Sequence, residues 1–224
     1  MNKLNHVAFI MDGNGRWGKK RNKGRNFGHL KGVETVKKIV KATIKIGIPV
    51  VTFYVFSTEN WKRPKSEINF LFKLIINYFK REQKSVKSNG IKINIIGQSA
   101  KLPGRIKKVL NEISNLTKDN KKIIVNLAIN YGSKNEIVEA VKKTVKKNKI
   151  TPSSIEKNLY TKNLLNPDIL IRTGGHKRLS NCMLWQLAYA EIYFLDKLWP
   201  DFNEKDLRKI VKNFANIKRN FGSI

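Results

Sequence analysis

The residues with the clearest chemical potential stand near the start of the chain, where an apolar run over residues 7–11 is followed by Asp12. Two glycines, Gly13 and Gly15, and then Arg16 come next. The run has the length and apolar content of a buried strand, and the glycines allow a turn whose N–H groups point at an anion. In an open parallel sheet such a turn lies at the carboxyl end of its strand, where ligands collect. A helix that begins there adds the positive end of its dipole. The segment therefore predicts an anion site beside a carboxylate.

A diphosphate fits this site on one condition. Asp12 would repel a diphosphate unless a divalent cation such as Mg²⁺ lay between them, with Arg16 taking the residual charge. Two other interpretations stay open. The glycine spacing that begins at Gly13 also fits the dinucleotide-binding fingerprint, but the acidic residue expected about 20 positions later is represented only by Glu34, inside a predicted helix. A plain surface turn also needs glycines, but it explains neither the carboxylate nor the arginine.

The apolar pattern along the chain predicts alternating strands and helices. Short apolar runs predict strands over residues 7–11, 50–56, 91–96, 123–129, 168–171 and 192–195. Apolar residues at helical spacing predict helices over residues 33–46, 68–86, 106–116, 137–145 and 207–214. This alternation predicts a single α/β domain over residues 1–224, with a mostly parallel six-stranded central sheet flanked by helices on both faces. Residues 146–162 are the least patterned and suggest an exposed connection.

Charge and cysteine content limit the class of protein. The chain has 224 residues, 46 Lys and Arg against 16 Asp and Glu, and a formal net charge of +30. The lysines are spread over nearly every predicted helix, which is typical of a solvated surface rather than of a specific nucleic-acid-binding stripe. Such charge still favours peripheral contact with anionic lipid headgroups and incidental nucleic-acid binding at low salt. The lone Cys182 excludes an intrachain disulfide and suggests a small core residue. With no membrane-length apolar run and no leader, the sequence predicts a cytoplasmic protein.

Several segments together resemble the cis-prenyltransferases, the family of undecaprenyl and other polyprenyl diphosphate synthases. The segments occur in the family's order, at residues 6–17, 25–29, 56–64, 171–175, 178–181 and 184–193. The resemblance implies the cis-prenyltransferase fold and a homodimer. It also implies Mg²⁺-dependent sequential condensation of isopentenyl diphosphate onto an allylic prenyl diphosphate primer, farnesyl or geranylgeranyl diphosphate. The implied product is a long-chain polyprenyl diphosphate for a glycosyl-carrier lipid.

The resemblance also implies roles for individual residues. Asp12 is the catalytic carboxylate that carries Mg²⁺ to the diphosphates, and Glu191 matches a second carboxylate near the metal. Asn60 is placed as the proton acceptor, with Ser57 or water as a relay, since a neutral amide is a poor base on its own. The residues implied to contact substrate are Gly13, Asn14, Gly15, Arg16, Trp17, Arg25, His29, Ser57, Thr58, Glu59, Trp61, Arg63, Arg172, Arg178, Leu179 and Ser180.

These substrate contacts divide into two groups. By resemblance, the glycine turn after Asp12, with Arg25 and His29, cradles the allylic diphosphate, and Arg172, Arg178 and Ser180 bind isopentenyl diphosphate. Trp61 has a structural alternative, as a cap on the core. The apolar stripe on the second predicted helix indicates either a tunnel for the growing prenyl chain or plain core packing. The stripe consists of Ile68, Leu71, Phe72, Ile75, Ile76 and Phe79.

Two places depart from the family's pattern. His176 and Lys177 follow the glycine pair, where many relatives have a glutamate, and Asn220 stands where relatives commonly have an arginine that reaches the neighbouring subunit's substrate. These departures permit a second interpretation, a non-catalytic partner subunit of a heteromeric cis-prenyltransferase. A basic nucleic-acid-binding protein is a third. His6 is expected to orient the first strand. The primer, the product length and the homomeric or heteromeric assembly stay open.

Overall fold

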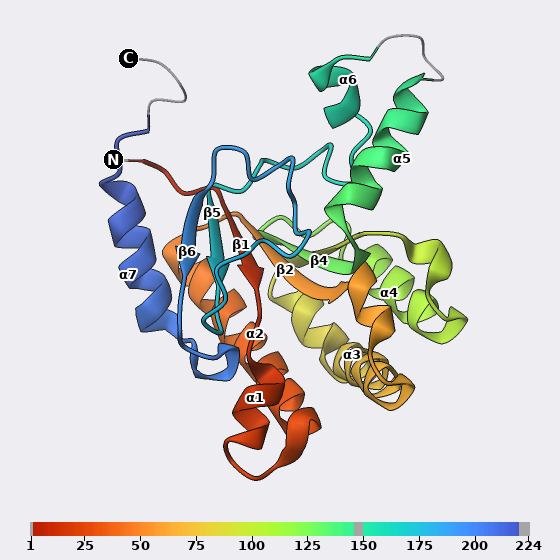
Figure 1. The fold of residues 1–224 in the computed structure, drawn as a ribbon, viewed down its shortest axis with the longest axis vertical. Helices are drawn as coiled ribbons and strands as arrows, with labels where there is room; N and C mark the ends of the chain where they lie inside the picture. The colour runs from red at the N-terminus through yellow and green to blue at the C-terminus, as the bar shows by residue number, and fades with distance from the viewer. Residues whose placement is uncertain (1, 146–149, 220–224) are drawn as a thin grey trace.

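Parallel strands in the order β3-β4-β2-β1-β5-β6 form the centre of the computed structural model, which describes residues 2–145 and 150–219 (Figure 1). The strands are β1 (His6–Ile10), β2 (Val50–Ser57), β3 (Ile91–Ile96), β4 (Ile123–Tyr131), β5 (Ile169–Arg172) and β6 (Glu191–Phe194). The helices are α1 (Asn14–Lys19), α2 (Gly24–Ile46), α3 (Lys65–Ser88), α4 (Gly104–Leu116), α5 (Ser133–Val145), α6 (Pro152–Glu156) and α7 (Glu204–Ala215). Short 3₁₀ helices lie at η1 (Thr58–Lys62), η2 (Ser99–Lys101) and η3 (Trp199–Asp201).

The predicted strands are all confirmed, and no end differs by more than two residues. Every strand pair is parallel, so the sheet is wholly rather than mostly parallel. All five residues of β1 are buried, which explains why the sequence reads there as a continuous apolar run. Val7 and Phe9 pack in one core, and Ala8 and Ile10 pack in a second core on the opposite face.

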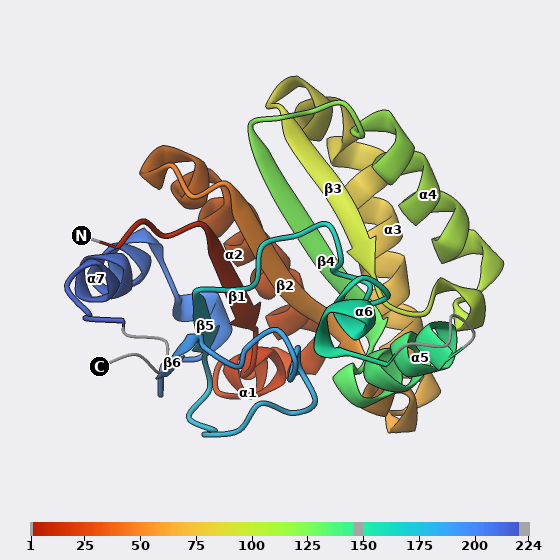
Figure 2. The same ribbon diagram turned by 90° about the horizontal axis from the view of Figure 1, so that it is seen from above.

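The larger core lies under helices α2, α3, α4 and α7 (Figure 2). Helix α2 packs against both α3 and α7, and α3 packs against α4. Aromatic rings fill the centre of this core: Phe9 stacks on Phe53 with ring centroids 5.3 Å apart, and Trp199 stacks on Phe202 at 5.6 Å. Because these rings join β1, β2 and η3, they fix the end of β1 that carries Asp12.

The opposite face differs from the prediction of helices on both sides. Its buried hydrophobic side chains come from the strands and from the irregular segment between β5 and β6, which supplies Cys182, Met183 and Leu187. Helix α5 reaches this face through the buried Glu136, whose Oε2 accepts from Tyr131 Oη at 2.5 Å. Ser180, Asn181 and Met183 have positive φ angles of 50°, 61° and 46°, which an α-helix does not permit. Cys182 is 1% exposed, as expected for a small core residue, and burial raises the pKa of its thiol.

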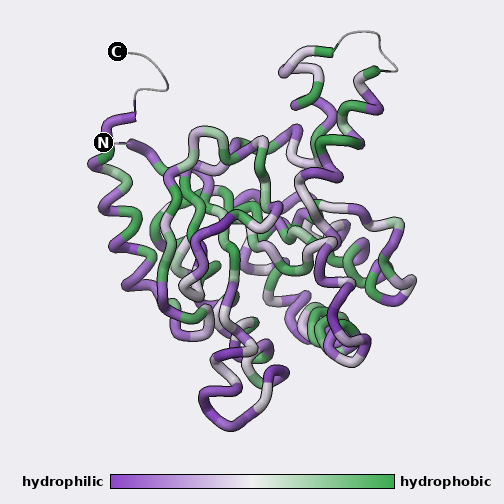
Figure 3. The backbone as a smooth tube through the Cα atoms, in the orientation of Figure 1, coloured by the Kyte–Doolittle hydropathy of each residue, from purple (hydrophilic) through white to green (hydrophobic). Residues whose placement is uncertain are grey.

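Helix α2 begins nine residues before the predicted start. The prediction missed its first turns because they carry Gly24, Gly28 and Gly32, and glycine is a poor helix former. Gly28 and Gly32 serve packing instead, whereas Gly24 has a positive φ of 67° and no heavy atom within 4 Å of where a Cβ would lie. A Cβ on Gly28 would lie 1.8 Å from the carbonyl oxygen of Asn14, so only glycine lets α1 cross α2 this closely. The connection between the two helices is strongly hydrophilic, whereas hydrophobic residues gather in the sheet (Figure 3).

Of the unpatterned region 146–162, residues 146–149 lie outside the described part, and α6 occupies 152–156. His6 is fully buried at the start of β1, where Nδ1 lies 2.6 Å from the Leu165 carbonyl and Nε2 lies 2.7 Å from Thr52 Oγ1. His6 thus anchors the first strand, as predicted. Within residues 2–145 and 150–219, no helix has both the length and the hydrophobicity to cross a bilayer.

Candidate active site

Asp12 lies just after β1, at the carboxyl edge of the sheet. Its main-chain oxygen accepts hydrogen bonds from Trp199 N at 3.0 Å and from Thr173 Oγ1 at 2.8 Å. Its carboxylate accepts from two arginines, with Oδ1 3.2 Å from Arg16 Nη2 and Oδ2 3.0 Å from Arg172 Nη2. Burial works against the charged carboxylate, but the hydrogen bonds and charges of the two arginines outweigh it and hold the pKa of Asp12 below its usual value. Asp12 is therefore an anion at neutral pH.

The position of Asp12 follows from the topology of the sheet. The chain leaves β1 toward β2 on one side, and it leaves β5 toward β6 on the other, so the connections diverge between β1 and β5. Ligands in open α/β sheets collect at such a switch point. Asp12 and Arg172 stand on its two sides.

Glycines are required on both sides of this point. Gly13 has a φ of 106°, and a Cβ there would lie 2.7 Å from the side chain of Leu198. Gly174 has a φ of 91°, and a Cβ there would lie 2.6 Å from Arg16 Nη2, which donates to the Gly174 carbonyl at 2.7 Å. The two turns therefore bring the backbone against the Asp12–Arg16 pair in a way that only glycine allows.

A cavity of about 540 Å³ opens beside Asp12. The predicted site residues that line it are Asp12, Asn14, His29, Ser57, Glu59, Asn60, Arg63, Arg172 and Ser180. Tyr54 and Asn181 also line the cavity, although the sequence interpretation gave them no role there. Leu71 of the predicted apolar stripe lines it too. Other predicted site residues lie around the cavity without lining it, namely Gly13, Gly15, Arg16, Trp17, Arg25, Thr58, Trp61, Arg178 and Leu179.

Glu67, at the start of α3, organises one side of the site and was not predicted. Its carboxylate accepts from Arg25 Nε and Nη2 at 3.2 and 3.0 Å and from Arg63 Nη1 at 3.1 Å. His29 Nε2 lies 3.4 Å from Glu67 Oε1, but no described group lies in hydrogen-bonding geometry with it. Burial, followed by the charge of Arg63, lowers the pKa of His29, so its ring is neutral at pH 7. The i,i+4 spacing of Arg63 and Glu67 was the signal available in the sequence.

Ser57 and Asn60 hold each other at the end of β2, where Ser57 N donates to Asn60 Oδ1 at 3.2 Å. The amide oxygen proposed as a proton acceptor is thus engaged by the backbone. Trp61 is 37% exposed and packs on the outside of the core, where its ring centroid lies 5.2 Å from that of Phe56, and its Nε1 donates to Asn130 Oδ1 at 2.7 Å. Its contacts match the structural alternative, a cap on the core.

Arg172 is only 4% exposed and holds the loop that follows β5. Its Nη1 donates to Ser180 Oγ at 2.7 Å and also to the carbonyl oxygen of Arg178. Its Nε is buried with no hydrogen-bond partner among the described residues. A buried donor without an acceptor is costly, and an oxygen of a bound anion would satisfy it. Arg178 itself is exposed, and Leu179 packs against the second core.

Trp17 faces away from Asp12. Its Nε1 donates to Asp201 Oδ1 at 2.7 Å, and the guanidinium of Arg21 lies 3.8 Å from the ring centroid. Gly15 serves the packing of Arg25, since a Cβ there would lie 2.8 Å from the Arg25 guanidinium carbon. Both residues therefore shape the site from outside the cavity.

Glu191 does not reach Asp12 within one chain. It begins β6 and pairs with Ile169 at the start of β5, whereas Asp12 lies beyond the strand ends marked by Arg172 and Phe194. Three residues of a parallel strand span about 10 Å. Glu191 therefore lies near the amino ends of the strands, and Asp12 lies at their carboxyl ends. The sequence motif could not show this, because it carries no information on strand register. His176 and Lys177 lie at the surface in the loop after β5, and Asn220 lies outside the described residues.

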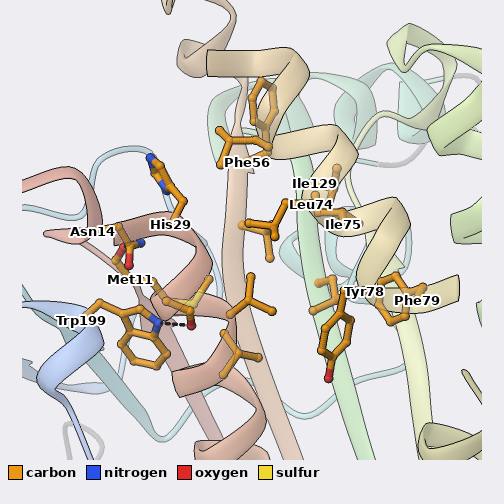
Figure 4. Close-up of a pocket in the computed structure, with 16 residues that line it drawn as sticks. Met11, Asn14, His29, Phe56, Leu74, Ile75, Tyr78, Phe79, Ile129 and Trp199 are labelled. Carbon is orange, nitrogen blue, oxygen red and sulfur yellow. Dashed lines mark hydrogen bonds between the residues drawn. The ribbon is translucent and has the colours of Figure 1, made fainter. Parts of the chain in front are cut away.

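Two apolar cavities lie between α2, α3 and the sheet, and one of them adjoins the polar cavity. The first, of about 120 Å³, has Met11, Ile75 and Tyr78 in its wall (Figure 4). It shares Met11, Val55 and Leu71 with the polar cavity. The second, of about 80 Å³, shares Tyr78 and Phe79 with the first. A 2.6 Å ion pair between Lys37 and Glu82 forms part of its wall.

The predicted apolar stripe on α3 therefore divides into two sets. Leu71, Ile75 and Phe79 line the first apolar cavity. Ile68, Phe72 and Ile76 are buried in the core without lining it. Leu74 and Tyr78 also line the cavity but were not predicted. Both interpretations of the stripe thus describe part of it.

The donor set suits a magnesium ion shared with substrate. No group of three or more His, Cys, Asp or Glu side chains able to hold a metal gathers within residues 2–145 and 150–219. Mg²⁺ usually takes one or two carboxylates together with substrate phosphates and waters. Asp12 is an ionised carboxylate at the wall of a cavity large enough for anions, so it fits that pattern.

The chain matches the family described as undecaprenyl diphosphate synthase over residues 10–222. An isoprenyl transferase of Fusobacterium nucleatum is 43% identical over 221 residues, which cover 98% of this chain and 96% of that protein. An isoprenyl transferase of Clostridium perfringens is 45% identical over 227 residues, with 98% and 90% covered.

Solved structures agree with this match. Lavandulyl diphosphate synthase from Lavandula x intermedia, in complex with dimethylallyl diphosphate, is 34% identical and aligns with a TM-score of 0.94 over 98% of both chains. A probable undecaprenyl diphosphate synthase from Campylobacter jejuni is also 34% identical, with a TM-score of 0.86 over 100% of both chains. The similarity in sequence and in structure spans nearly the whole chain.

Proposed function

Since the chain belongs to the undecaprenyl diphosphate synthase family of isoprenyl transferases, we propose that it is a cis-polyprenyl diphosphate synthase. It adds isopentenyl diphosphate repeatedly to an allylic primer and makes a long-chain polyprenyl diphosphate. The observation that carries this proposal is a row of adjacent cavities: the polar cavity at Asp12 shares wall residues with an apolar cavity, which shares wall residues with a second one. The first suits diphosphates, and the others suit a growing hydrocarbon chain.

The diphosphate groups are bound by the residues around Asp12. Arg16 and Arg172 present guanidinium groups, and the buried Nε of Arg172 offers a donor to a phosphate oxygen. Asp12 would hold Mg²⁺, which when bound supplies positive charge against the charge developing on the leaving diphosphate. Because these groups are fixed before substrate arrives, they need little reorganisation during reaction.

The reaction forms a carbon–carbon bond as the allylic carbon–oxygen bond breaks, and the condensation product then loses a proton. Both electrons of the broken bond leave with the diphosphate. We assign the proton-accepting position to the pair of Ser57 and Asn60, which line the polar cavity. The neutral His29 ring lies on the same wall and offers Nε2 to a ligand.

A homodimer is part of the proposal. Strand β6 is an edge of the sheet, and it carries Ile192 and Phe194, which are 39% and 36% exposed, next to Tyr189 at 65%. An exposed apolar edge strand is a usual place for an interface. Glu191 lies on this strand, so a metal-binding role for it requires a second copy of the chain. Light scattering of the purified chain and of Phe194→Lys tests this: the variant is expected to be monomeric.

We expect a cytoplasmic enzyme that makes peripheral contact with an anionic membrane. The basic segment between α1 and α2 supports this contact. Lys20, Arg21 and Lys23 are exposed there, as is Lys19 at the end of α1. Each such cation near an anionic surface contributes about 1 kcal/mol. Sedimentation with anionic and with neutral vesicles measures this contact, and equal binding to both would contradict it.

The first experiment is incorporation of labelled isopentenyl diphosphate by the purified chain with Mg²⁺, with farnesyl or geranylgeranyl diphosphate as primer. Long polyprenyl products that disappear in Asp12→Ala are expected, and they would identify the primer. If neither primer gives a product, the alternative of a non-catalytic partner subunit is favoured, and the chain should regain activity only with a second subunit.

A further inference from the structure

Three loops meet at one wall of the polar cavity, and Asn181 joins them. Its Nδ2 donates to Glu59 Oε1 at 2.8 Å, in the loop after β2. Its Oδ1 accepts from Lys134 N at 2.8 Å, and its carbonyl accepts from Ser133 N at 2.9 Å, both at the start of α5. Both ends of one amide side chain therefore connect the loop after β5 to two other loops.

The backbone at Asn181 is in an uncommon conformation. Its φ of 61° lies in the left-handed region, as does that of its neighbour Ser180 at 50°. Asparagine tolerates this region better than other residues with a side chain, and such backbone persists only where surrounding contacts hold it. Ser180 is the residue whose Oγ accepts from Arg172 Nη1. The contacts of Asn181 thus hold the loop that carries a predicted isopentenyl diphosphate ligand.

Gly132, directly after β4, shows how closely the three loops pack. A Cβ on Gly132 would lie 2.5 Å from Thr58 Oγ1 and 2.8 Å from Asn181 Nδ2. The loop after β2 and the loop after β5 therefore both rest on this one position. A small displacement of either loop would be transmitted to the other.

Glu59 lines the polar cavity, yet a carboxylate is a poor partner for two diphosphates. Its oxygens are already used, since Oε1 accepts from Asn181 Nδ2 and Oε2 accepts from Thr58 Oγ1 at 3.2 Å. Partial burial opposes the charge of Glu59, but these hydrogen bonds outweigh it and lower its pKa. Its contacts are therefore with the protein.

We propose that the hydrogen bond between Glu59 and Asn181 is a clasp that fixes the loop after β2 against the loop that binds isopentenyl diphosphate. Glu59 and Asn181 are positioning residues, and neither contacts a diphosphate. The inference rests on the proposed function for its kinetic consequence, but the clasp itself is a property of the protein without ligand.

The test compares Glu59→Ala, Asn181→Ala, their double variant and Glu59→Gln. Loss of the clasp is expected to raise KM for isopentenyl diphosphate about tenfold, which corresponds to the free energy of one charge-assisted hydrogen bond. KM for the primer should change less than twofold. The double variant should be no worse than the worse single variant. Glu59→Gln keeps an oxygen acceptor and should restore most of the loss. Asn120→Ala, which removes hydrogen bonds to the Lys87 and Ile91 carbonyls, is the matched control.

A second readout needs no turnover. In the unliganded protein, Glu59→Ala should accelerate hydrogen exchange across residues 178–184 and at Lys134, and Glu59→Gln should not. Equal impairment by Glu59→Gln and Glu59→Ala, additive single effects, or unchanged exchange would overturn the clasp. An inactive wild-type protein would overturn the proposed function instead, and hydrogen exchange would still decide the clasp. Thermal unfolding of each variant separates these effects from misfolding.

Discussion

Arg172 Nη2 donates to Asp12 Oδ2 at 3.0 Å, across the point where the chain connections of the sheet diverge. The same guanidinium donates from Nη1 to Ser180 Oγ at 2.7 Å. One buried side chain therefore joins the turn after β1 to the loop after β5. Only a planar group with several fixed donors can hold both at once.

Replacing Arg172 with lysine should separate charge from geometry. Arg172→Lys keeps the positive charge but cannot reach Asp12 and Ser180 together. We expect kcat/KM to fall about 10²-fold, comparable to the loss of one preorganised donor. Steady-state kinetics with both substrates measures this. A fall of less than threefold would show that charge alone suffices.

Gly28→Ala should destabilise the protein, although alanine normally favours a helix. The new Cβ would lie 1.8 Å from the Asn14 carbonyl oxygen, so α1 must move away from α2. Overpacking of this kind costs about 1–3 kcal/mol, which lowers Tm by about 2–12 °C in a chain of this size.

Gly104→Ala is the matched control for that prediction. No heavy atom lies within 4 Å of a Cβ at Gly104, which begins α4. This change should be neutral or slightly stabilising, by up to about 1 kcal/mol. Equal Tm values for the two variants would contradict the close crossing of α1 and α2.

His6 should make the folded protein sensitive to mild acid. Burial lowers the pKa of His6 from 6.5 to about 4. Above pH 6.5 the ring is neutral in the folded and unfolded chains, and its contribution to stability is complete. Between pH 6.5 and 4 the unfolded chain binds a proton that the folded chain does not. The free energy of unfolding therefore decreases as the pH is lowered below 6.5. The loss is about 2 kcal/mol at pH 5 and about 3 kcal/mol once the pH is below 4.

Urea unfolding of wild type and His6→Asn at pH 7 and pH 5 measures this effect. His29 titrates in the same direction, because its pKa is also lowered, so the difference between the two proteins is the relevant quantity. The wild type should lose about 2 kcal/mol more than the variant over this range. Parallel losses would show that His6 does not carry the effect.

Tyr78 should influence product length. Its side chain lines both apolar cavities and contacts Phe79, with ring centroids 5.4 Å apart. Tyr78→Ala removes the ring from between the cavities, so products with more isoprene units are expected by mass spectrometry. Tyr78→Phe keeps the ring and should keep the product length. An unchanged distribution in Tyr78→Ala would place the limit elsewhere, with the Lys37–Glu82 pair as the next group to test.

The sequence by itself determined the strands, most helices and the carboxyl edge where Asp12 stands. These features depend on local periodicity. A strand that is buried along its whole length, such as β1, is recognised in the sequence by a continuous apolar run. The prediction made helix α2 too short because Gly28 and Gly32 lower helix propensity. These glycines are favourable only in the folded protein, where they let α2 pack closely against Asn14 of α1.

Only the tertiary structure decided which side chains of the site meet. Glu67 collects Arg25 and Arg63, and Asn181 reaches Glu59 over a sequence separation of 122 residues. Glu191 lies at the amino ends of the strands, away from Asp12, because strand register places it beside Ile169. No local sequence pattern encodes this register. Periodicity reports which face of an element is buried, whereas contacts between loops depend on how the whole chain closes around its core.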